Sequence, residues 1–345
     1  MPNLRIRRWL TALLCALGCA SAARAWERTD TLLMRSGDRI TCEIVKLEGG
    51  YLTARTLDFG TVTIEWTDIA GLISTHLFEV ERTDGARLTG HFDSEQPGVL
   101  TMRTMVEEGW IAIPFDQVIA IRQVGTSIWS SRRGHINFGL DFAHADQDTD
   151  FSLDAELTFQ GRRFTWKNTA TSSISDDGSS DRRERDNVVG QLEIPAGVRF
   201  AWMGRGSYER NDDLGLDLRL TAAVAALWLP LRGEHGRMGL GLGVAEAEEN
   251  YTGIPRSTVT SGMVILAGEY HRFGSYGTTL GMELVYLPTF SENRYRVEMR
   301  ASLSQKIAGD LNIAFSPYYS SDSRPPSPAV ADEDWGWISS IGWRF

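Results

Sequence analysis

Apolar and polar residues alternate in long runs from Gly134 to the end of the chain. In the clearest run, apolar residues occupy every second position from Leu214 to Trp228, and the positions between them include Asp217 and Arg219. Successive side chains of a β-strand point to opposite faces, so such a strand has one apolar and one polar face. The alternation predicts an antiparallel all-β structure over residues 134–345.

The length of these runs indicates what their apolar faces meet. Several runs extend to about 10 residues or more, the length that a tilted strand needs to cross a bilayer, whereas strands of soluble proteins usually have about 5–6 residues. We therefore predict a transmembrane antiparallel β-barrel of about 12 strands. The predicted strands cover approximately 134–144, 150–160, 163–174, 186–195, 198–209, 214–229, 237–248, 262–272, 278–288, 293–305, 310–320 and 334–345.

The connections between these strands are sorted by length. The second, fourth and tenth are tight, whereas the third, seventh and eleventh are long and polar and cover 175–184, 249–261 and 321–333. Outer-membrane barrels have short periplasmic turns and longer outer loops, and an even strand count returns both ends of the barrel to the periplasm. A soluble sandwich gives no reason for this sorting.

The last strand carries a more specific signal. A terminal aromatic residue on an alternating strand resembles the signal by which the outer-membrane assembly machinery recognises its clients, and the aromatic rings suit an interfacial girdle. The residues that form this face are Trp335, Trp337, Ile341, Trp343 and Phe345.

The polar faces of the predicted strands carry charges of both signs. In a barrel these faces point into the lumen, where opposite charges can pair across strands. The charges that we expect in the lumen are Asp217, Arg219, Glu283, Arg296, Glu298 and Arg300.

Residues 30–124 contain one pattern twice. The segment Gly37–Ile44 matches Gly85–Phe92, and Ile64–Ile69 is echoed by Ile113–Val118. A repeat of this length indicates one duplicated supersecondary unit. Short alternating runs and glycine-containing turns predict a small, strongly bent sheet, similar to Sm-like or SH3-like barrels. We assign residues 27–125 to a periplasmic domain that contacts cell wall or periplasmic proteins.

The first 25 residues read as a secretory signal peptide. A basic start precedes a short apolar stretch, and Ala23-Arg24-Ala25 fits the A-x-A cleavage rule. An alternative reading makes Cys19 a lipidated cysteine. Either way the chain is exported, and with the barrel this predicts a location in the cell outer membrane.

Charge and cysteine content exclude other classes. Cleavage after Ala25 removes four of the 35 basic residues and none of the 45 acidic ones, leaving 31 against 45 and a formal charge of −14. This balance argues against nucleic acid as a partner. Only Cys42 remains after cleavage, so the chain has no disulfide framework, and we expect this thiol to be buried. The longest later apolar run, Ala222–Leu229, is too short for a membrane helix.

The overall layout resembles a known family. The repeat's Gly-Asp-Arg-Ile-Thr segment and a barrel stretch with Asn211, Gly215, Leu216, Asp217 and Arg219 are similar to the salt-induced outer-membrane protein family, whose barrel is a domain of unknown function. The resemblance implies architecture and location. It carries no reaction and no catalytic residues.

Three patterns suggest chemistry but favour simpler interpretations. Asp146, Asp148 and Asp150 alternate as calcium ligands do, yet the EF-hand glycine is missing, so we expect a solvated acidic turn. Gly239, Gly241 and Gly243 alternate with apolar residues, which indicates the inward face of a strand, with lumen space or tight packing beside it. None of the six histidines has a recognisable nucleophile beside it: His76, His91, His135, His144, His235 and His271. We expect no catalytic residue, metal or cofactor.

The sequence predicts an outer-membrane envelope protein with a charged and largely packed lumen, and the family resemblance implies a response to stress or salt. Its expected partners are lipid, lipopolysaccharide and the assembly machinery. One alternative is a narrow channel for small solutes or ions, whose selectivity the lumen charges set. A second is a soluble periplasmic binding module.

Overall fold

The computed structural model describes residues 30–344 except 95, 105–108, 125–131, 144–147, 162–163, 177–182, 272–276, 291–292 and 327–331. The predicted signal peptide, Cys19, the aspartate at 146 and the terminal Phe345 lie outside the described residues. In the described part of the chain, no helix is both long and apolar enough to cross a membrane.

Residues 30–123 form a nine-stranded antiparallel sheet, which we call the N-terminal module. Its strand order is β4-β3-β2-β1-β5-β6-β7-β8, and β9 pairs with both β2 and β5. The pairing of β9 bends the sheet around one core. The elements are β1 (Asp30–Met34), β2 (Arg39–Glu48), β3 (Tyr51–Arg55), β4 (Thr61–Glu65), η1 (Trp66–Asp68), β5 (Ile69–Arg82), β6 (Arg87–Asp93), β7 (Val99–Thr104), β8 (Trp110–Pro114), η2 (Phe115–Gln117) and β9 (Val118–Gln123).

The two short 3₁₀ helices of the module occupy matching places in the sequence pattern and meet in the core. The rings of Trp66 in η1 and Phe115 in η2 stack with centroids 4.3 Å apart. The Trp66 indole Nε1 also donates a hydrogen bond to the Phe115 carbonyl oxygen at 3.0 Å. Because both side chains are buried, this contact joins the two halves of the module. Cys42 is fully buried in the same core, as expected.

Residues 132–344 form a closed antiparallel barrel, in which each strand pairs with the next and β10 pairs with β21. The predicted fold class, all-β with a barrel of about 12 strands, is confirmed. The strands are β10 (Arg132–Ala143), β11 (Asp148–Gln160), β12 (Thr165–Asp176), β13 (Arg183–Pro195), β14 (Phe200–Asn211), β15 (Leu216–Gly233), β16 (Gly236–Tyr251), β17 (Ser257–His271), β18 (Thr278–Pro288), β19 (Tyr295–Ala308), β20 (Leu311–Asp322) and β21 (Glu333–Arg344), with η4 (Asp212–Leu214) before β15.

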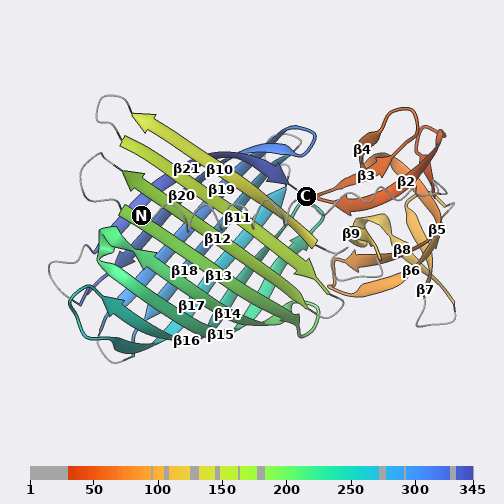
Figure 1. Ribbon diagram of the computed structural model, residues 1–345. Coiled ribbons are helices and arrows are strands. Elements are labelled where there is room, and N and C mark those ends of the chain that lie inside the picture. The colour runs from red at the N-terminus through yellow and green to blue at the C-terminus, as the bar shows by residue number, and fades with distance from the viewer. Residues whose placement is uncertain are drawn as a thin grey trace.

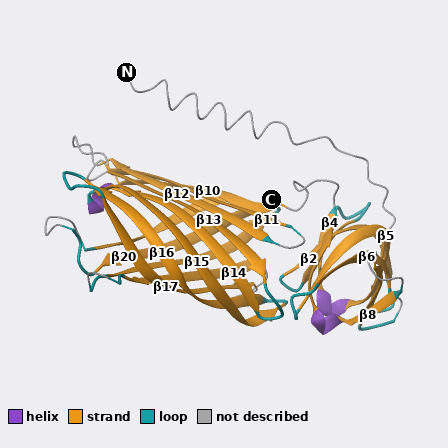
Figure 2. Ribbon diagram, turned by 90° about the horizontal axis from the view of Figure 1, so that it is seen from below, coloured by secondary structure: helices purple, strands orange, loops and turns teal. Residues whose placement is uncertain are grey.

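The N-terminal module lies against one end of the barrel, which we call the module end (Figure 1). The turns that follow β11, β13 and β15 lie there, since Gly161, Val198 and His235 each contact the module. The C-terminal strand finishes at the same end (Figures 1 and 2). We call the opposite end, which holds η4, the far end.

Outward-facing positions of the barrel strands are apolar and exposed. Leu242, for example, is 64% exposed, whereas its neighbours Gly241 and Gly243 face inward. The predicted aromatic face of the last strand also points outward, with Trp335, Trp337, Ile341 and Trp343 between 50% and 64% exposed. The barrel therefore presents a broad apolar surface around its wall. Other members of this surface are Trp202, Val224, Trp228, Leu240 and Phe315.

Candidate functional site

The far end of the lumen is filled by a cluster of buried ion pairs, which we call the far-end cluster. Its centre is Glu249 on β16, whose carboxylate pairs with Arg219 at 3.0 Å, Arg294 at 2.9 Å and Arg296 at 3.0 Å. Arg219 also pairs with Glu209 at 2.9 Å, and all of these side chains are less than 10% exposed. Breaking such a buried pair by removing one partner is costly because it leaves a charge uncompensated. The cluster also includes Tyr251 and Asp322.

Several of these contacts cross the lumen. Asp334 on β21 pairs with Arg185 of β13 at 2.8 Å and accepts a hydrogen bond from the Asn211 side chain of β14 at 2.7 Å. Strand β21 is not a neighbour of β13 or β14 in the barrel order, so these bonds cross the lumen instead of joining adjacent strands. We call such cross-lumen bonds chords. The Arg185 guanidinium also lies 3.6 Å from the centre of the Tyr318 ring. The far end is consequently bridged by polar side chains.

A further ion pair lies nearer the middle of the barrel. Arg205 of β14 binds Glu283 of β18 through two hydrogen bonds of 2.8 and 3.1 Å. Strands β14 and β18 are separated by three others, so this pair also spans part of the lumen. Two nitrogen donors facing two carboxylate oxygens give the pair a defined geometry.

Most of the lumen charges expected from the sequence face the interior. Arg219 and Arg296 belong to the far-end cluster, and Glu298 pairs with Arg296 at 3.1 Å. Glu283 pairs with Arg205, and Arg300 lines the cavity beside it.

Asp217 is different, and its assignment as a lumen charge is wrong. A β-bulge lies between Leu216 and Leu218, so the two-residue alternation slips at this point. Asp217 is exposed and accepts a hydrogen bond from the Thr252 hydroxyl at 2.9 Å.

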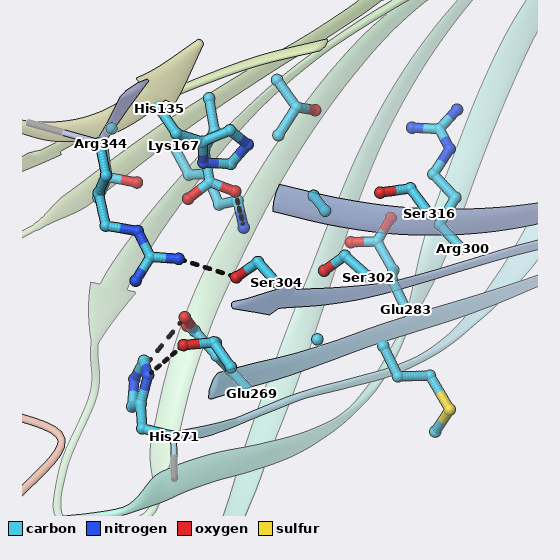
Figure 3. A pocket seen from close by; sticks show the side chains of 18 of the residues that line it. His135, Lys167, Glu269, His271, Glu283, Arg300, Ser302, Ser304, Ser316 and Arg344 are labelled. Carbon is cyan, nitrogen blue, oxygen red and sulfur yellow. Dashed lines mark hydrogen bonds and ion pairs between the residues drawn. The ribbon is translucent and has the colours of Figure 1, made fainter. Parts of the chain in front are cut away.

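The lumen holds a cavity of about 570 Å³ that runs from the module end past the Arg205–Glu283 pair to Arg185 and Tyr318. Figure 3 shows part of its lining, with His271 and Glu269 directed toward one another and the Arg344 side chain reaching Ser304. The Arg344 guanidinium donates to the Ser304 hydroxyl at 2.8 Å. This volume is within the range of small-molecule sites in proteins.

One arc of the lumen wall, β14 to β18, has an apolar cluster on its inner face, between the charged residues, as well as an apolar outer face. Gly241 and Gly243 of β16 make this possible: a Cβ on Gly241 would lie 2.5 Å from Leu227 Cδ2 and 2.6 Å from Ile265 Cγ2. Of the two sequence expectations for these glycines, tight packing holds at Gly241 and Gly243, whereas Gly239 lines the cavity. The inner face of the arc consists of Ala201, Met203, Ala223, Ala225, Leu227, Leu229, Ala245, Met263, Ile265, Val285 and Leu287.

The module lies over the cavity at its end of the barrel and lines part of it. The turn between β2 and β3 contains Gly49 and Gly50, both with positive φ, and it lies against the barrel rim. A Cβ on Gly50 would lie 2.5 Å from the His235 ring, and one on Gly49 would lie 2.9 Å from His271 Cβ. Lys46, Glu48 and Thr53 of the module line the same cavity. Glycine is therefore required at the turn for two reasons, backbone conformation and close approach.

An arginine cluster around Glu81 attaches the module to the barrel. Glu81 of β5 pairs with Arg122 at 3.2 Å and also with Arg232 of the barrel. Burial alone would raise the Glu81 pKa, but the guanidinium groups of Arg122, Arg87 and Arg232 outweigh it and hold the pKa at about 2. Arg87 adds a second link, since it donates to the Gly161 carbonyl and to the Thr165 hydroxyl of the barrel.

The family model described as "Protein of unknown function, DUF481" matches residues 136–334. The chain belongs to this family. The DUF481 match includes the far-end cluster and most of the cavity wall, and it excludes the N-terminal module and the aromatic residues at 335–343. The family name carries no activity.

Two further comparisons add nothing to the assignment of the chain to DUF481. No curated protein matches the chain. A solved structure titled as porin aligns over 92% of this chain and 98% of its own, with 10% identity and a TM-score of 0.29. A likeness this weak carries no argument about this DUF481 protein.

Sequence reasoning missed the apolar arc, the cavity and the arginine cluster around Glu81. A signal for the arc was present in the run Ala222–Leu229, because a strand that is buried on both faces is apolar at consecutive positions. No comparable signal marks Glu81 or the Gly49–Gly50 turn, whose partners on the barrel are more than a hundred residues away in sequence.

Proposed function

We propose that this protein is an outer-membrane β-barrel of the bacterial cell envelope, with a lumen that its own side chains close at the far end. The exposed apolar surface around the wall supports this location, because such a surface needs lipid around it. The even strand count and the aromatic face of β21 agree with it. The module end is then periplasmic and the far end faces outward.

In this proposal the protein has structural partners rather than a substrate. Lipid and lipopolysaccharide contact the apolar wall, and the assembly machinery recognises the last strand. The module, held in the periplasm by the Glu81 cluster, contacts cell wall or periplasmic proteins. The resemblance to the salt-induced family suggests that its expression rises in high salt, which quantifying the protein in cells shifted to high salt tests.

The observation that carries the proposal is the far-end cluster. Glu249 with its three arginines, and Asp334 with Arg185 and Asn211, bridge the lumen where solutes would enter from outside. A lumen crossed by hydrogen-bonded chords gives no continuous water path. The protein therefore acts as a closed barrel.

Single-channel recording in planar bilayers tests this closure. We expect the wild-type protein to give no current steps above background. The double variant Arg294→Ser, Arg296→Ser removes two bulky side chains from the far-end cluster and should produce steps. The exposed control Arg256→Ser, whose side chain is 59% exposed, should stay silent. Regular current steps from the wild-type protein would overturn the proposal.

The second candidate function is a narrow channel for small solutes. The cavity of about 570 Å³ favours it, because this cavity already runs from the module end past the Arg205–Glu283 pair to Arg185. Wild-type current steps in the same recordings would support this candidate. The soluble-module alternative has less support, since it leaves Trp202, Trp337 and Trp343 exposed to water at 58% or more.

A further inference from the structure

The cavity at the module end has two chemically different walls. On the arc from β14 to β18, Met203, Leu227, Leu229 and Ile265 line it. These residues form an apolar inner face, which is unusual for a membrane barrel, where inward positions are commonly polar. An apolar wall inside a lumen is stabilised when apolar atoms rather than water cover it.

The opposite wall is polar and rich in hydroxyl groups. Strands β11 and β12 lie six places from β17 and β18 in a barrel of twelve, and so face them across the lumen. Their cavity-lining side chains include Thr158, Thr169 and Thr171, and β19 adds Ser302 and Ser304. A molecule lying in this space therefore contacts an apolar surface on one side and hydrogen-bonding groups on the other.

Most carboxylates in the cavity are already neutralised by a partner. Glu156 pairs with Lys167 at 2.8 Å, Glu193 with Arg237 at 2.7 Å, and Glu283 with Arg205 as described above. At the rim, Glu48 pairs with Lys46 at 2.9 Å, and Asp154 is hydrogen-bonded to the His135 ring at 2.9 Å.

Two cations near the module end lack such a partner. Lys306 of β19 and Arg344 of β21 both line the cavity, and neither forms an ion pair with a carboxylate of the described residues. Arg344 donates to Ser304, which leaves its other N–H groups for a ligand. Positive charge beside hydroxyl groups is the arrangement that binds a carboxylate or a phosphate head group.

We propose that this cavity binds a small single-chain amphipathic anion, a molecule with an alkyl chain and one anionic head group. The chain lies along Met203, Leu227 and Ile265, and the head group lies between Lys306 and Arg344. The module lies over the occupant, because its β2–β3 turn packs against His235 and His271 and lines the cavity. Entry then takes place from the module end, since the far-end cluster blocks the other.

This inference goes beyond the proposed envelope function and does not depend on conductance. A closed barrel and a conducting one can both hold such an occupant. Binding and channel recordings therefore fail independently.

Binding of decanoate tests the inference, with the full chain in lipid nanodiscs and protein-free nanodiscs subtracted. We expect saturable binding of one decanoate per protein by equilibrium dialysis. Ala267→Trp, which places a large side chain in the cavity, should weaken binding by tenfold or more. The matched control Ala226→Trp, on the outward face of the same arc, should bind like the wild type. Heat-modifiable migration on a denaturing gel verifies that both variants fold.

The head group is tested separately. Lys306→Gln with Arg344→Gln should weaken decanoate binding about tenfold and leave decanol binding unchanged, because only the carboxylate meets those cations. Decyltrimethylammonium, with the opposite charge, should bind less tightly than decanoate to the wild type. Absence of saturable decanoate binding, or equal binding by the Ala267→Trp variant, would overturn the inference. Equal affinity for the anionic and cationic probes would overturn the assignment of the head group.

Discussion

At the scale of single residues, the lumen is organised by acidic side chains that each hold several arginines. Glu249 binds Arg219, Arg294 and Arg296, and Glu81 does the same for Arg122 and Arg232 outside the barrel wall. Each of these acids is buried, so its charge is stable only because the arginines surround it. Removing one acid leaves several cations uncompensated at once.

We therefore expect Glu249→Gln to destabilise the barrel by about 3–5 kcal/mol. Glutamine keeps the shape of the side chain and removes the charge. Urea titration in lipid vesicles, followed by tryptophan fluorescence, measures the free energy of unfolding. Glu248→Gln is the control, because Glu248 is 40% exposed and pairs with the exposed Arg256. That surface change should cost less than about 1 kcal/mol. Equal losses in the two variants would show that the far-end cluster contributes no special stability.

At the scale of elements, the close packing of β15 against β16 depends on glycine in β16. Gly243 lies opposite Ala225 of β15, and a Cβ there would be 2.1 Å from the Val224 carbonyl oxygen and 2.7 Å from Ala225 Cβ. Backbone atoms cannot move aside as a flexible side chain does. The glycine thus allows β15 and β16 to keep an apolar inner face at close approach.

Gly243→Ala should lower the stability of the barrel by about 1–3 kcal/mol through overpacking. The readout is the temperature at which the compact gel band converts to the unfolded one. Gly204→Ala on β14 is the matched control, since a Cβ there meets nothing within 4 Å. The control should convert at the wild-type temperature or above it. A wild-type conversion temperature for Gly243→Ala would contradict the packing argument.

The twelve barrel strands could be predicted from the sequence because a period of two persists along each of them. The inward positions of Arg219, Glu283 and Arg296 followed from the same period. Asp217 did not, since the bulge beside Leu216 breaks the alternation locally. The sequence also could not predict which acid pairs with which arginine, because cross-lumen bonds such as Asp334–Arg185 depend on barrel closure.

At the scale of the whole molecule, two bodies with separate cores meet through a small set of charged contacts. The Glu81 cluster and the Gly49–Gly50 turn place the module against the barrel rim. The sequence pattern reports which face of a strand is apolar, and these contacts are charged or made by glycine. The sequence therefore predicted both bodies but did not predict how the module docks on the barrel.

Docking should weaken in acid. The Glu81 pKa is lowered from 4.5 to about 2 where the arginines surround it, so protons bind preferentially to the separated or unfolded state. Relative to the unfolded chain, this stabilisation is fully present above about pH 4.5, is lost as the pH falls toward 2 and amounts to about 3 kcal/mol. Docking receives only the part that Arg232 supplies, because Arg122 and Arg87 belong to the module. Glu81→Gln should remove this pH dependence between those limits.

Spin labels at Leu57→Cys on the module and Leu231→Cys on the barrel measure the docking by their distance distribution. Both positions are more than 60% exposed. Cys42 does not compete for the label, because burial, followed by the charges of Asp30 and Glu43, raises the pKa of its thiol to about 12. A distribution that stays narrow down to pH 2 in the wild type would contradict the role of Glu81.

The far-end cluster has a consequence for what the lumen can sense. Because the cluster blocks one end of the lumen, the cavity equilibrates only with the compartment at the module end. Molecules at the far end do not change what the cavity contains, whatever their concentration. The occupancy of the lumen therefore reports only on the compartment in which the module resides.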